Sequence, residues 1–262
     1  DLAHISCWLT DNRLFINKKK CELIFLGTSS RLKKAEPKLR SCNVHIENDV
    51  IQRANCCKYL GVIFDENLQW NAHIDYLHKK VVKYIYLLKR IRPFIDQRTS
   101  LLFYTSIIQS HLDYCNVVWG NTGKRNCDKL QVLQNRSLRI TMSVDSMYST
   151  KALYEYLKLD RLNVRRSKHL ALSVFRAVRL LGPSCISELF IIRDAIYNTR
   201  SGNTQIKLTK PKTNYGKRKF SYKGAQLWNR LESSVTSMSL DAFKRYLNTI
   251  TDIILLSNPN SA

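Results

Sequence analysis

Two His-x-Asp triplets come nearest, by residue type and spacing, to a metal site. They are His73-Ile74-Asp75 and His111-Leu112-Asp113. In an iron-dependent dioxygenase, such a pair of ligands binds the metal together with a distant histidine. The first triplet lies in a predicted helix, where side chains two residues apart point to nearly opposite sides and cannot ligate one ion. The second lies at a helix end and is less securely excluded. We interpret both as solvated helix residues.

Other catalytic patterns are absent from the sequence. Phosphoryl transfer by two metal ions needs clustered carboxylates, but there is no Asp-Asp pair and the acidic residues are scattered. There is also no glycine-rich phosphate loop and no Gly-x-Ser-x-Gly elbow. None of the eight cysteines forms a Cys-x-x-Cys pair, and Cys56 and Cys57, which precede His73 and His78, are adjacent. We therefore predict no catalytic residue and no metal site.

The net charge points to a polyanionic partner. Lys and Arg outnumber Asp and Glu by 43 to 20, which gives a net charge of +23. This surplus favours nucleic acid, with an anionic membrane face as the weaker alternative, and it predicts no sequence specificity. No apolar run is long enough to span a bilayer, so we expect no membrane partner. We expect an intracellular location, cytoplasmic and nuclear, with the cysteines reduced and used as small core residues.

The candidate nucleic-acid contacts are basic residues outside the predicted apolar seams. They are Lys18, Lys19 and Lys20 near the N-terminus, Lys79, Lys80, Lys83, Lys89, Arg90 and Arg92 on one helix, Arg136 and Arg139 three apart on another, and Lys217, Arg218 and Lys219 after a glycine. For any single lysine, simple solvation is the preferred interpretation, whereas the summed charge favours binding. Tyr104, Tyr114 and Trp119 are possible stacking platforms for bases, although we place Tyr104 and Trp119 in the core.

The secondary-structure elements that must position these residues are predicted to change from strands to helices near residue 66. The first 65 residues are interpreted as short strands and turns, with a hairpin from Leu14–Ile16 and Leu23–Leu26, a second pair from Val44–Ile46 and Val50–Ile51, and a buried strand at Tyr59–Phe64. A helix follows, because Trp70, Ile74, Leu77, Val81, Tyr84, Leu88 and Ile91 alternate at intervals of four and three residues until Pro93.

Further helices are predicted downstream. Their expected ranges are 99–119, a segment carrying Leu130, Leu133 and Leu138, and then 150–157, 161–181, 224–231 and 240–250, with a basic linker or mobile loop at 198–219. The predicted fold is therefore mainly α with a small N-terminal β element, an α+β arrangement.

Several motifs, taken in order, resemble the region that follows the catalytic aspartates in the reverse transcriptases of non-long-terminal-repeat retrotransposons. The motifs are Trp8-Leu9-x-x-Asn12-x-Leu14-x-Ile16-Asn17-x-x-Lys20, Lys58-Tyr59-Leu60-Gly61-Val62 with Asp65, Trp70 and His73, Leu112-Asp113-Tyr114 with Trp119-Gly120, Leu130-Gln131-x-Leu133-Gln134-Asn135-Arg136-x-x-Arg139-Ile140, Arg165-Arg166, and Phe220-Ser221-Tyr222-x-Gly224-x-x-x-Trp228-Asn229-x-Leu231 with Phe243-Lys244. The resemblance covers nearly the whole chain and depends on the order and spacing of these motifs.

The resemblance implies an RNA-directed DNA polymerase whose partners are an RNA template and a DNA primer, bound as an RNA–DNA or RNA duplex. It implies palm-edge hairpins at 1–66, a helical thumb-like domain at 67–197, and a basic loop with short helices at 198–262. By analogy Gly61 approaches the primer terminus, because a residue without Cβ lets a ligand come close; an ordinary glycine at a strand bend is the equal alternative.

The resemblance also implies what the chain lacks. The family's aromatic-Ala-Asp-Asp motif lies upstream of the region that Trp8 begins, as do the fingers and an endonuclease domain. We therefore expect a fragment that is inactive alone, with those upstream polymerase domains as missing partners. No cofactor is expected in this chain, and Mg²⁺ only in the complete polymerase.

Two alternatives remain. The first is a standalone RNA- or tRNA-binding module with a cellular role. The second is an AlkB-like iron and 2-oxoglutarate dioxygenase, or a protein associated with tRNA methyltransferases, because the stretch Lys58–Arg92 is also similar to a short segment of such proteins. Neither a metal triad nor a cofactor-binding glycine motif supports this second alternative.

Overall fold

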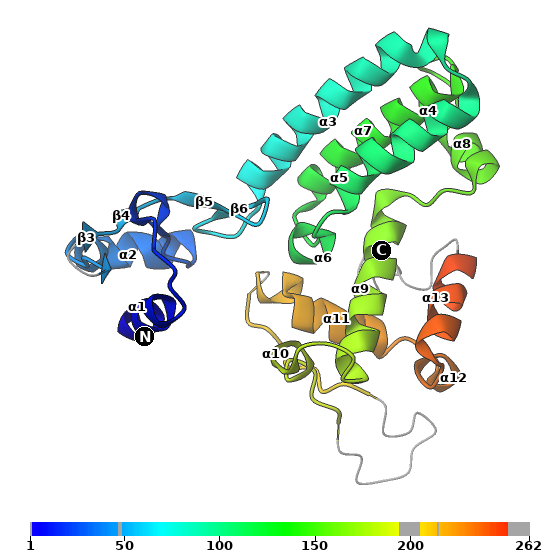
Figure 1. The fold of residues 1–262 in the computed structure, drawn as a ribbon. Coiled ribbons are helices and arrows are strands. Elements are labelled where there is room, and N and C mark those ends of the chain that lie inside the picture. The colour runs from blue at the N-terminus through cyan, green and yellow to red at the C-terminus, as the bar shows by residue number, and fades with distance from the viewer. Residues whose placement is uncertain (1, 47–48, 194–204, 214, 251–262) are drawn as a thin grey trace. The chain divides into compact units, whose positions relative to one another are not determined.

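The computed structural model describes residues 2–46, 49–193, 205–213 and 215–250 (Figure 1). The chain divides into two compact units, and the boundary lies between Tyr76 and Leu77, inside the helix α3 (Asn71–Ile91). Helices dominate, and the strands are two to four residues long. The predicted fold class, mainly α with a small β element, is therefore confirmed. The predicted domain boundaries at 66 and 197 stay a prediction.

The N-terminal unit contains short elements. They are α1 (Leu2–Asp11), η1 (Lys18–Lys20), β1 (Glu22–Leu23), α2 (Ser29–Arg40), β2 (His45–Ile46), β3 (Asp49–Val50), β4 (Gln52–Arg53), β5 (Cys56–Tyr59) and β6 (Val62–Asp65). Few of the apolar side chains described in this unit are buried, chiefly Leu32, Ile46, Val62 and Ile74. A core of that size supplies little of the stability that a compact unit needs.

Two helices, α1 and α2, lie in the stretch predicted as short strands and turns, so that prediction was wrong there. Leu14–Ile16 forms no strand, and β1 pairs with β4 in parallel, with Glu22 opposite Gln52, instead of closing a hairpin. The helix α2 begins after Thr28, whose side chain accepts a hydrogen bond from the Arg31 N–H at 3.4 Å. The predicted second pair is confirmed, because β2 and β3 are antiparallel, with His45 opposite Val50.

The segment predicted as one buried strand at Tyr59–Phe64 is instead a hairpin. Strands β5 and β6 pair antiparallel from Cys56 opposite Asp65 to Tyr59 opposite Val62, and the chain turns at Leu60 and Gly61. Their φ angles are 44° and 83°, and positive φ at both central residues is what a two-residue type I′ turn requires. Tyr59 and Leu60 are exposed at this turn.

The long helix α3 confirms the predicted seam with one change of register. Ile74, Leu77, Val81 and Leu88 are buried as expected, but Ile85 is buried where Tyr84 was predicted. The Tyr84 ring instead contacts the His111 ring edge-on, with centroids 5.1 Å apart. A short 3-10 turn, η2 (Arg92–Phe94), follows at Pro93.

The remaining elements belong to the second unit. They are α4 (Gln97–Phe103), η3 (Tyr104–Gln109), α5 (Ser110–Asp113), α6 (Asn116–Trp119), α7 (Lys124–Met142), α8 (Thr150–Leu157), α9 (Leu162–Val178), α10 (Ser184–Ser187), η5 (Gly216–Arg218), α11 (Phe220–Trp228), α12 (Ser233–Thr236) and α13 (Leu240–Thr249). The predicted helices around 130–138, 150–157, 161–181, 224–231 and 240–250 thus correspond to α7, α8, α9, α11 and α13.

The helix predicted as continuous over 99–119 is interrupted, and that prediction is corrected. The segment η3 is π-helical, and the chain changes direction at Cys115, whose φ is 50°. The Trp119 indole N–H then donates to the Tyr114 carbonyl oxygen at 2.9 Å, which holds α6 against the end of α5. A π-helical segment inserts an extra residue into the turn, so the apolar spacing alone does not reveal it.

A second core packs α9 against α11 and α13. The Phe175 ring stacks on Phe243 with centroids 4.3 Å apart and also contacts Trp228. Gly224 permits the close approach of α11, because a Cβ there would lie 2.6 Å from Cγ2 of Val174. The predicted loop at 198–219 lies partly outside the described residues, and its described part includes η5 and a bridge between Ile192 and Ile206.

The cysteines are not core residues, so that prediction was wrong. All eight lie in the described part of the chain as free thiols, five of them exposed and three half-buried. None of the described helices combines the length and the apolarity needed to cross a bilayer.

Candidate nucleic-acid interface

The outer face of α3 carries a row of basic and aromatic side chains. Lys79, Lys83, Tyr86 and Arg90 follow at intervals of four, three and four residues, so they lie on one face of the helix. All four are exposed, and they lie opposite the buried seam that includes Val81. Packing of the seam therefore directs these groups into solvent.

A neighbouring helix adds to this row. Arg136 of α7 places its guanidinium carbon 5.3 Å from the centre of the Tyr86 ring, within the range of a cation–π contact. Arg125, Lys129 and Arg139 share the outer face of α7 with Arg136. We call Lys79, Lys83, Tyr86, Arg90 and Arg136 the basic stripe. The structure thus brings Arg136 against the Tyr86 ring, although the two residues lie 50 positions apart in the sequence.

Some predicted contacts have structural partners. The Arg92 guanidinium donates to the carbonyl oxygens of Thr141 and Ile95, both at 2.9 Å, so it joins the end of α3 to the end of α7. Arg139 donates to the Tyr148 carbonyl oxygen at 3.1 Å. Lys18 forms an ion pair with Asp49 at 2.7 Å. These side chains hold the fold together, and their contact with nucleic acid stays a prediction.

The other predicted contacts lie on separate elements. Lys80 and Lys89 flank the stripe on α3, Lys19 and Lys20 are exposed in η1, and Gly61 is in the β5–β6 turn. Lys217, Arg218 and Lys219 lie in and after η5, with Lys217 and Lys219 exposed. Of the aromatic residues, Tyr104 and Trp119 are fully buried, which confirms their predicted place in the core, and Tyr114 is half exposed.

The interpretation of both His-x-Asp triplets as solvated helix residues was wrong for His73, which is buried. The His73 Nδ1 accepts a hydrogen bond from the Ile63 N–H at 3.3 Å, and burial lowers the pKa of His73. The His111 Nδ1 lies 2.8 Å from the Ile107 carbonyl oxygen, and Asp113 is paired with Arg165. Within the described residues, no three His, Cys, Asp or Glu side chains converge as metal ligands.

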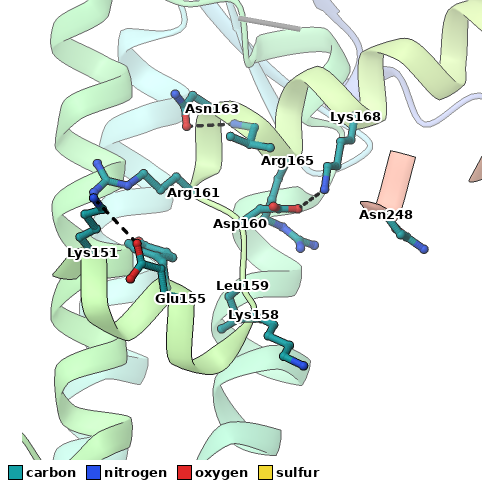
Figure 2. A pocket seen from close by; sticks show the side chains of 12 residues that line it. Lys151, Glu155, Lys158, Leu159, Asp160, Arg161, Asn163, Arg165, Lys168 and Asn248 are labelled. Atoms are coloured by element: carbon teal, nitrogen blue, oxygen red, sulfur yellow. Dashed lines mark hydrogen bonds and ion pairs between the residues drawn. The ribbon is translucent and has the colours of Figure 1, made fainter. Parts of the chain in front are cut away.

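Sequence reasoning missed a hollow beside the α8–α9 loop. Figure 2 shows its lining, which encloses about 1010 Å³. We call it the basic hollow; it is lined by Lys151, Tyr154, Glu155, Lys158, Leu159, Asp160, Arg161, Asn163, Val164, Arg165, Lys168 and Asn248. Five of these residues are cationic and two are acidic. A possible signal was the run from Lys158 to Lys168, where five Lys or Arg residues surround one Asp.

A buried polar network holds the wall of the hollow. The Gln131 Nε2 donates to the Tyr154 hydroxyl at 2.8 Å, and that hydroxyl donates to the Gln134 Oε1 at 2.8 Å. The Gln134 Nε2 in turn donates to the Asp160 carbonyl oxygen at 3.0 Å. Gln131 Oε1 also accepts from the Leu162 N–H at 3.1 Å. The motif that contains Gln131 and Gln134 therefore positions the α8–α9 loop.

Comparison with curated proteins finds relatives of one kind. The chain is 27% identical over 134 residues to a protein of Drosophila melanogaster described as a probable RNA-directed DNA polymerase from transposon X-element. It is 23% identical over 130 residues to another from transposon BS of the same species. Each match covers 48% of this chain but only 15% and 14% of the relatives. No protein-family model and no solved structure matches the chain.

The two relatives agree with the family that the ordered motifs indicated. About half of this chain is similar to transposon RNA-directed DNA polymerases, of whose length it spans about one seventh. The predicted resemblance to a reverse transcriptase region of a non-long-terminal-repeat retrotransposon is thereby confirmed.

Proposed function

We propose that this chain is the nucleic-acid-holding region of a retrotransposon RNA-directed DNA polymerase, with an RNA template and a DNA primer as its ligands. The basic stripe carries this proposal, because it presents cations and one aromatic ring in a single row, away from the core. Such a row suits a sugar–phosphate backbone, whose contacts fix position without reading sequence. The net charge of +23 supports the same partner.

Catalysis is assigned to residues outside the described part of this chain. The described residues do not fit a Mg²⁺ site, because no three metal-binding side chains converge among them. We propose that Mg²⁺ binds in the complete polymerase and that the upstream polymerase domains are a protein partner. The exposed apolar side chains Leu2, Ile5 and Trp8 of α1 support such a partner. An intracellular location stays a prediction.

Fluorescence anisotropy with a labelled RNA–DNA duplex tests the proposal. The purified chain should bind with an affinity that falls steeply with salt and changes little when the duplex sequence is scrambled. Replacing Lys79, Lys83 and Arg90 together by Gln should reduce the slope of log affinity against log salt by about 3, since each lost phosphate contact removes about 0.9.

A matched control removes the same charge elsewhere. Lys33, Lys34 and Lys38 are exposed on α2, and their replacement by Gln should leave the slope close to that of the wild type. Binding that is flat between low and moderate salt, or equal losses in both triple variants, would overturn the role of the basic stripe.

The absence of catalysis is tested separately. With template, primer, Mg²⁺ and deoxynucleotides, the purified chain should extend no primer. Template-dependent DNA synthesis by this chain would show that it contains its own catalytic carboxylates, contrary to the proposal.

A further inference from the structure

The basic hollow has more positive charge than its own carboxylates can neutralise. Arg165 is held by Asp113, with Nη2 to Oδ2 at 2.5 Å. Lys168 is held by Asp160 at 2.7 Å, a pair that Figure 2 shows. These two pairs lie deep in the wall, where each side chain is about one fifth exposed or less. The two carboxylates neutralise Arg165 and Lys168, so the excess positive charge lies on the cations at the rim of the hollow.

The rim carries the uncompensated cations. Lys151 meets Glu155 only at 3.9 Å in an exposed pair, which contributes little. In the described part of the chain, no carboxylate lies within ion-pair distance of Lys158 or Arg161. The Arg161 guanidinium lies over the Tyr154 ring, with its carbon 5.3 Å from the ring centre. Arg161 is therefore held at the rim by a neutral ring, which leaves its charge for a ligand.

The backbone beneath these cations is fixed before any ligand arrives. Lys158 ends α8 in the left-handed conformation, with φ 50°, and the Leu159 N–H donates to the Tyr154 carbonyl oxygen at 3.1 Å. The Gln134 amide holds the Asp160 carbonyl oxygen from the buried side. A ligand bound here does not have to order the loop, so little binding energy is lost to conformational entropy.

The size and chemistry of the hollow select its ligand. A volume of about 1010 Å³ lies at the upper end of small-molecule pockets, so it holds more than one phosphate group. The one aromatic ring in the lining, that of Tyr154, is buried and covered by Arg161, so it offers no stacking surface to a base. The lining therefore suits the charged backbone of a strand and not its bases.

We propose that the basic hollow binds the phosphodiester backbone of a nucleic-acid strand as a second contact, separate from the basic stripe. The inference rests on the proposed function, because it assumes that nucleic acid is the ligand of this chain. Gln131 and Gln134 hold the hollow from one side of α7, whereas Arg136 joins the stripe from its outer face. One nucleic acid thus meets two separate surfaces of the same unit.

The test removes the two uncompensated cations without disturbing the loop. Asn accepts the left-handed conformation, so Lys158→Asn is combined with Arg161→Gln in the full chain. With a labelled RNA–DNA duplex that carries a single-stranded extension, affinity at 0.1 M salt should fall about tenfold or more, and the salt slope should fall by about 2. The double variant Lys33→Gln with Lys34→Gln removes the same charge from α2 and should match the wild type.

Protection from acetylation locates the contact. The oligonucleotide should shield Lys158 and Lys151 from an acetylating reagent, as measured by mass spectrometry, and should leave Lys33 reactive. Inorganic phosphate at the same total phosphate concentration should give no such shielding, because it cannot span the hollow. Equal shielding by inorganic phosphate would show a simple anion site and overturn the assignment to a strand.

The outcomes separate this inference from the proposed function. One set of results would overturn the role of the basic hollow and leave the proposed function intact. In it, the basic-stripe variant loses binding, the hollow variant keeps the wild-type salt slope, and Lys158 and Lys151 stay unshielded in the wild-type chain. No salt-dependent binding by the wild-type chain would overturn both. Weaker binding in the hollow variant with wild-type unfolding behaviour, and with Lys158 shielded in the wild type, supports the inference.

Discussion

The side-chain amide of Gln134 donates to the phenolic oxygen of Tyr104 at 3.1 Å, and both residues are completely buried. Burial raises the pKa of Tyr104 to about 12, so the phenol stays protonated at neutral pH. The Gln134 oxygen accepts from the Tyr154 hydroxyl at 2.8 Å. One amide of α7 therefore connects η3, α8 and the α8–α9 loop, on which the wall of the basic hollow depends.

Replacing Gln134 by Leu should destabilise the second unit. The change leaves the Tyr154 hydroxyl and the Asp160 carbonyl with fewer partners, and each unsatisfied buried group costs about 1 to 3 kcal/mol, so we expect a loss of about 2 to 5 kcal/mol. Urea unfolding followed by tryptophan fluorescence measures it. Gln97→Leu on the exposed start of α4 should stay within about 0.5 kcal/mol of the wild type. Equal midpoints for the two variants would contradict the role of the network.

His73 should make the stability depend on pH. Burial lowers the pKa of His73 in the folded chain, so the unfolded chain binds the proton more readily. The contribution of neutral His73 to stability is therefore fully present above the unfolded pKa of about 6.5 and is lost as the pH falls below it. Protonation also removes the acceptor for the Ile63 N–H. Burial lowers the pKa of His169 with the same sign, so a part of the wild-type decrease comes from the second unit.

The comparison of unfolding midpoints at pH 7.5 and 5.5 measures this effect. His73→Gln should lose less stability on acidification than the wild type, because one proton-linked contribution is gone. His45 is exposed in β2, and His45→Gln should keep the full wild-type decrease. An unchanged decrease in His73→Gln would show that the His73 ring is not the responsible group.

The turn at Leu60 and Gly61 should respond in opposite directions to two substitutions. Both residues have positive φ, which costs a non-glycine residue about 1 to 2 kcal/mol. Leu60→Asn should stabilise the hairpin by about 0.5 to 1 kcal/mol, because Asn is preferred at this position of a type I′ turn. Gly61→Ala should destabilise it by about 1 kcal/mol. Thermal unfolding of both variants measures the difference; a stabilising Gly61→Ala would contradict the turn.

Breaking the Arg165–Asp113 pair should lower stability and raise affinity for nucleic acid. Asp113→Asn weakens a bidentate pair that is about one fifth exposed, so we expect a loss of about 2 kcal/mol, less than for a fully buried pair. It also frees the charge of Arg165, which lines the basic hollow. Anisotropy and urea unfolding on the same sample test both signs. The control is Asp241→Asn, which breaks an exposed pair with Lys244 and should change stability and affinity for nucleic acid only slightly. If Asp113→Asn lost affinity as well as stability, the expected gain in affinity for nucleic acid would be contradicted.

The sequence alone determined the features that depend on local spacing. The seam of α3 and its end at Pro93 follow from helical periodicity and from the geometry of proline, and the bounds of α8 match the predicted 150–157. The charge surplus and the ordered motifs were also sufficient to identify the family of its relatives. These properties belong to residues a few positions apart, or to the chain as a whole.

The tertiary structure decided which side chains meet. The sequence predicted Arg92 and Lys18 as contacts for nucleic acid. In the structure, Arg92 donates to the carbonyl oxygen of Thr141, 49 positions away, and Lys18 forms an ion pair with Asp49, 31 positions away. The break at Cys115 and the burial of Ile85 in place of Tyr84 depend on how neighbouring helices pack. The wall of the basic hollow depends on the hydrogen bond from Gln134 to the carbonyl oxygen of Asp160, 26 residues further along the chain. Such pairings arise from chain closure and packing across elements, which periodicity within one element does not encode.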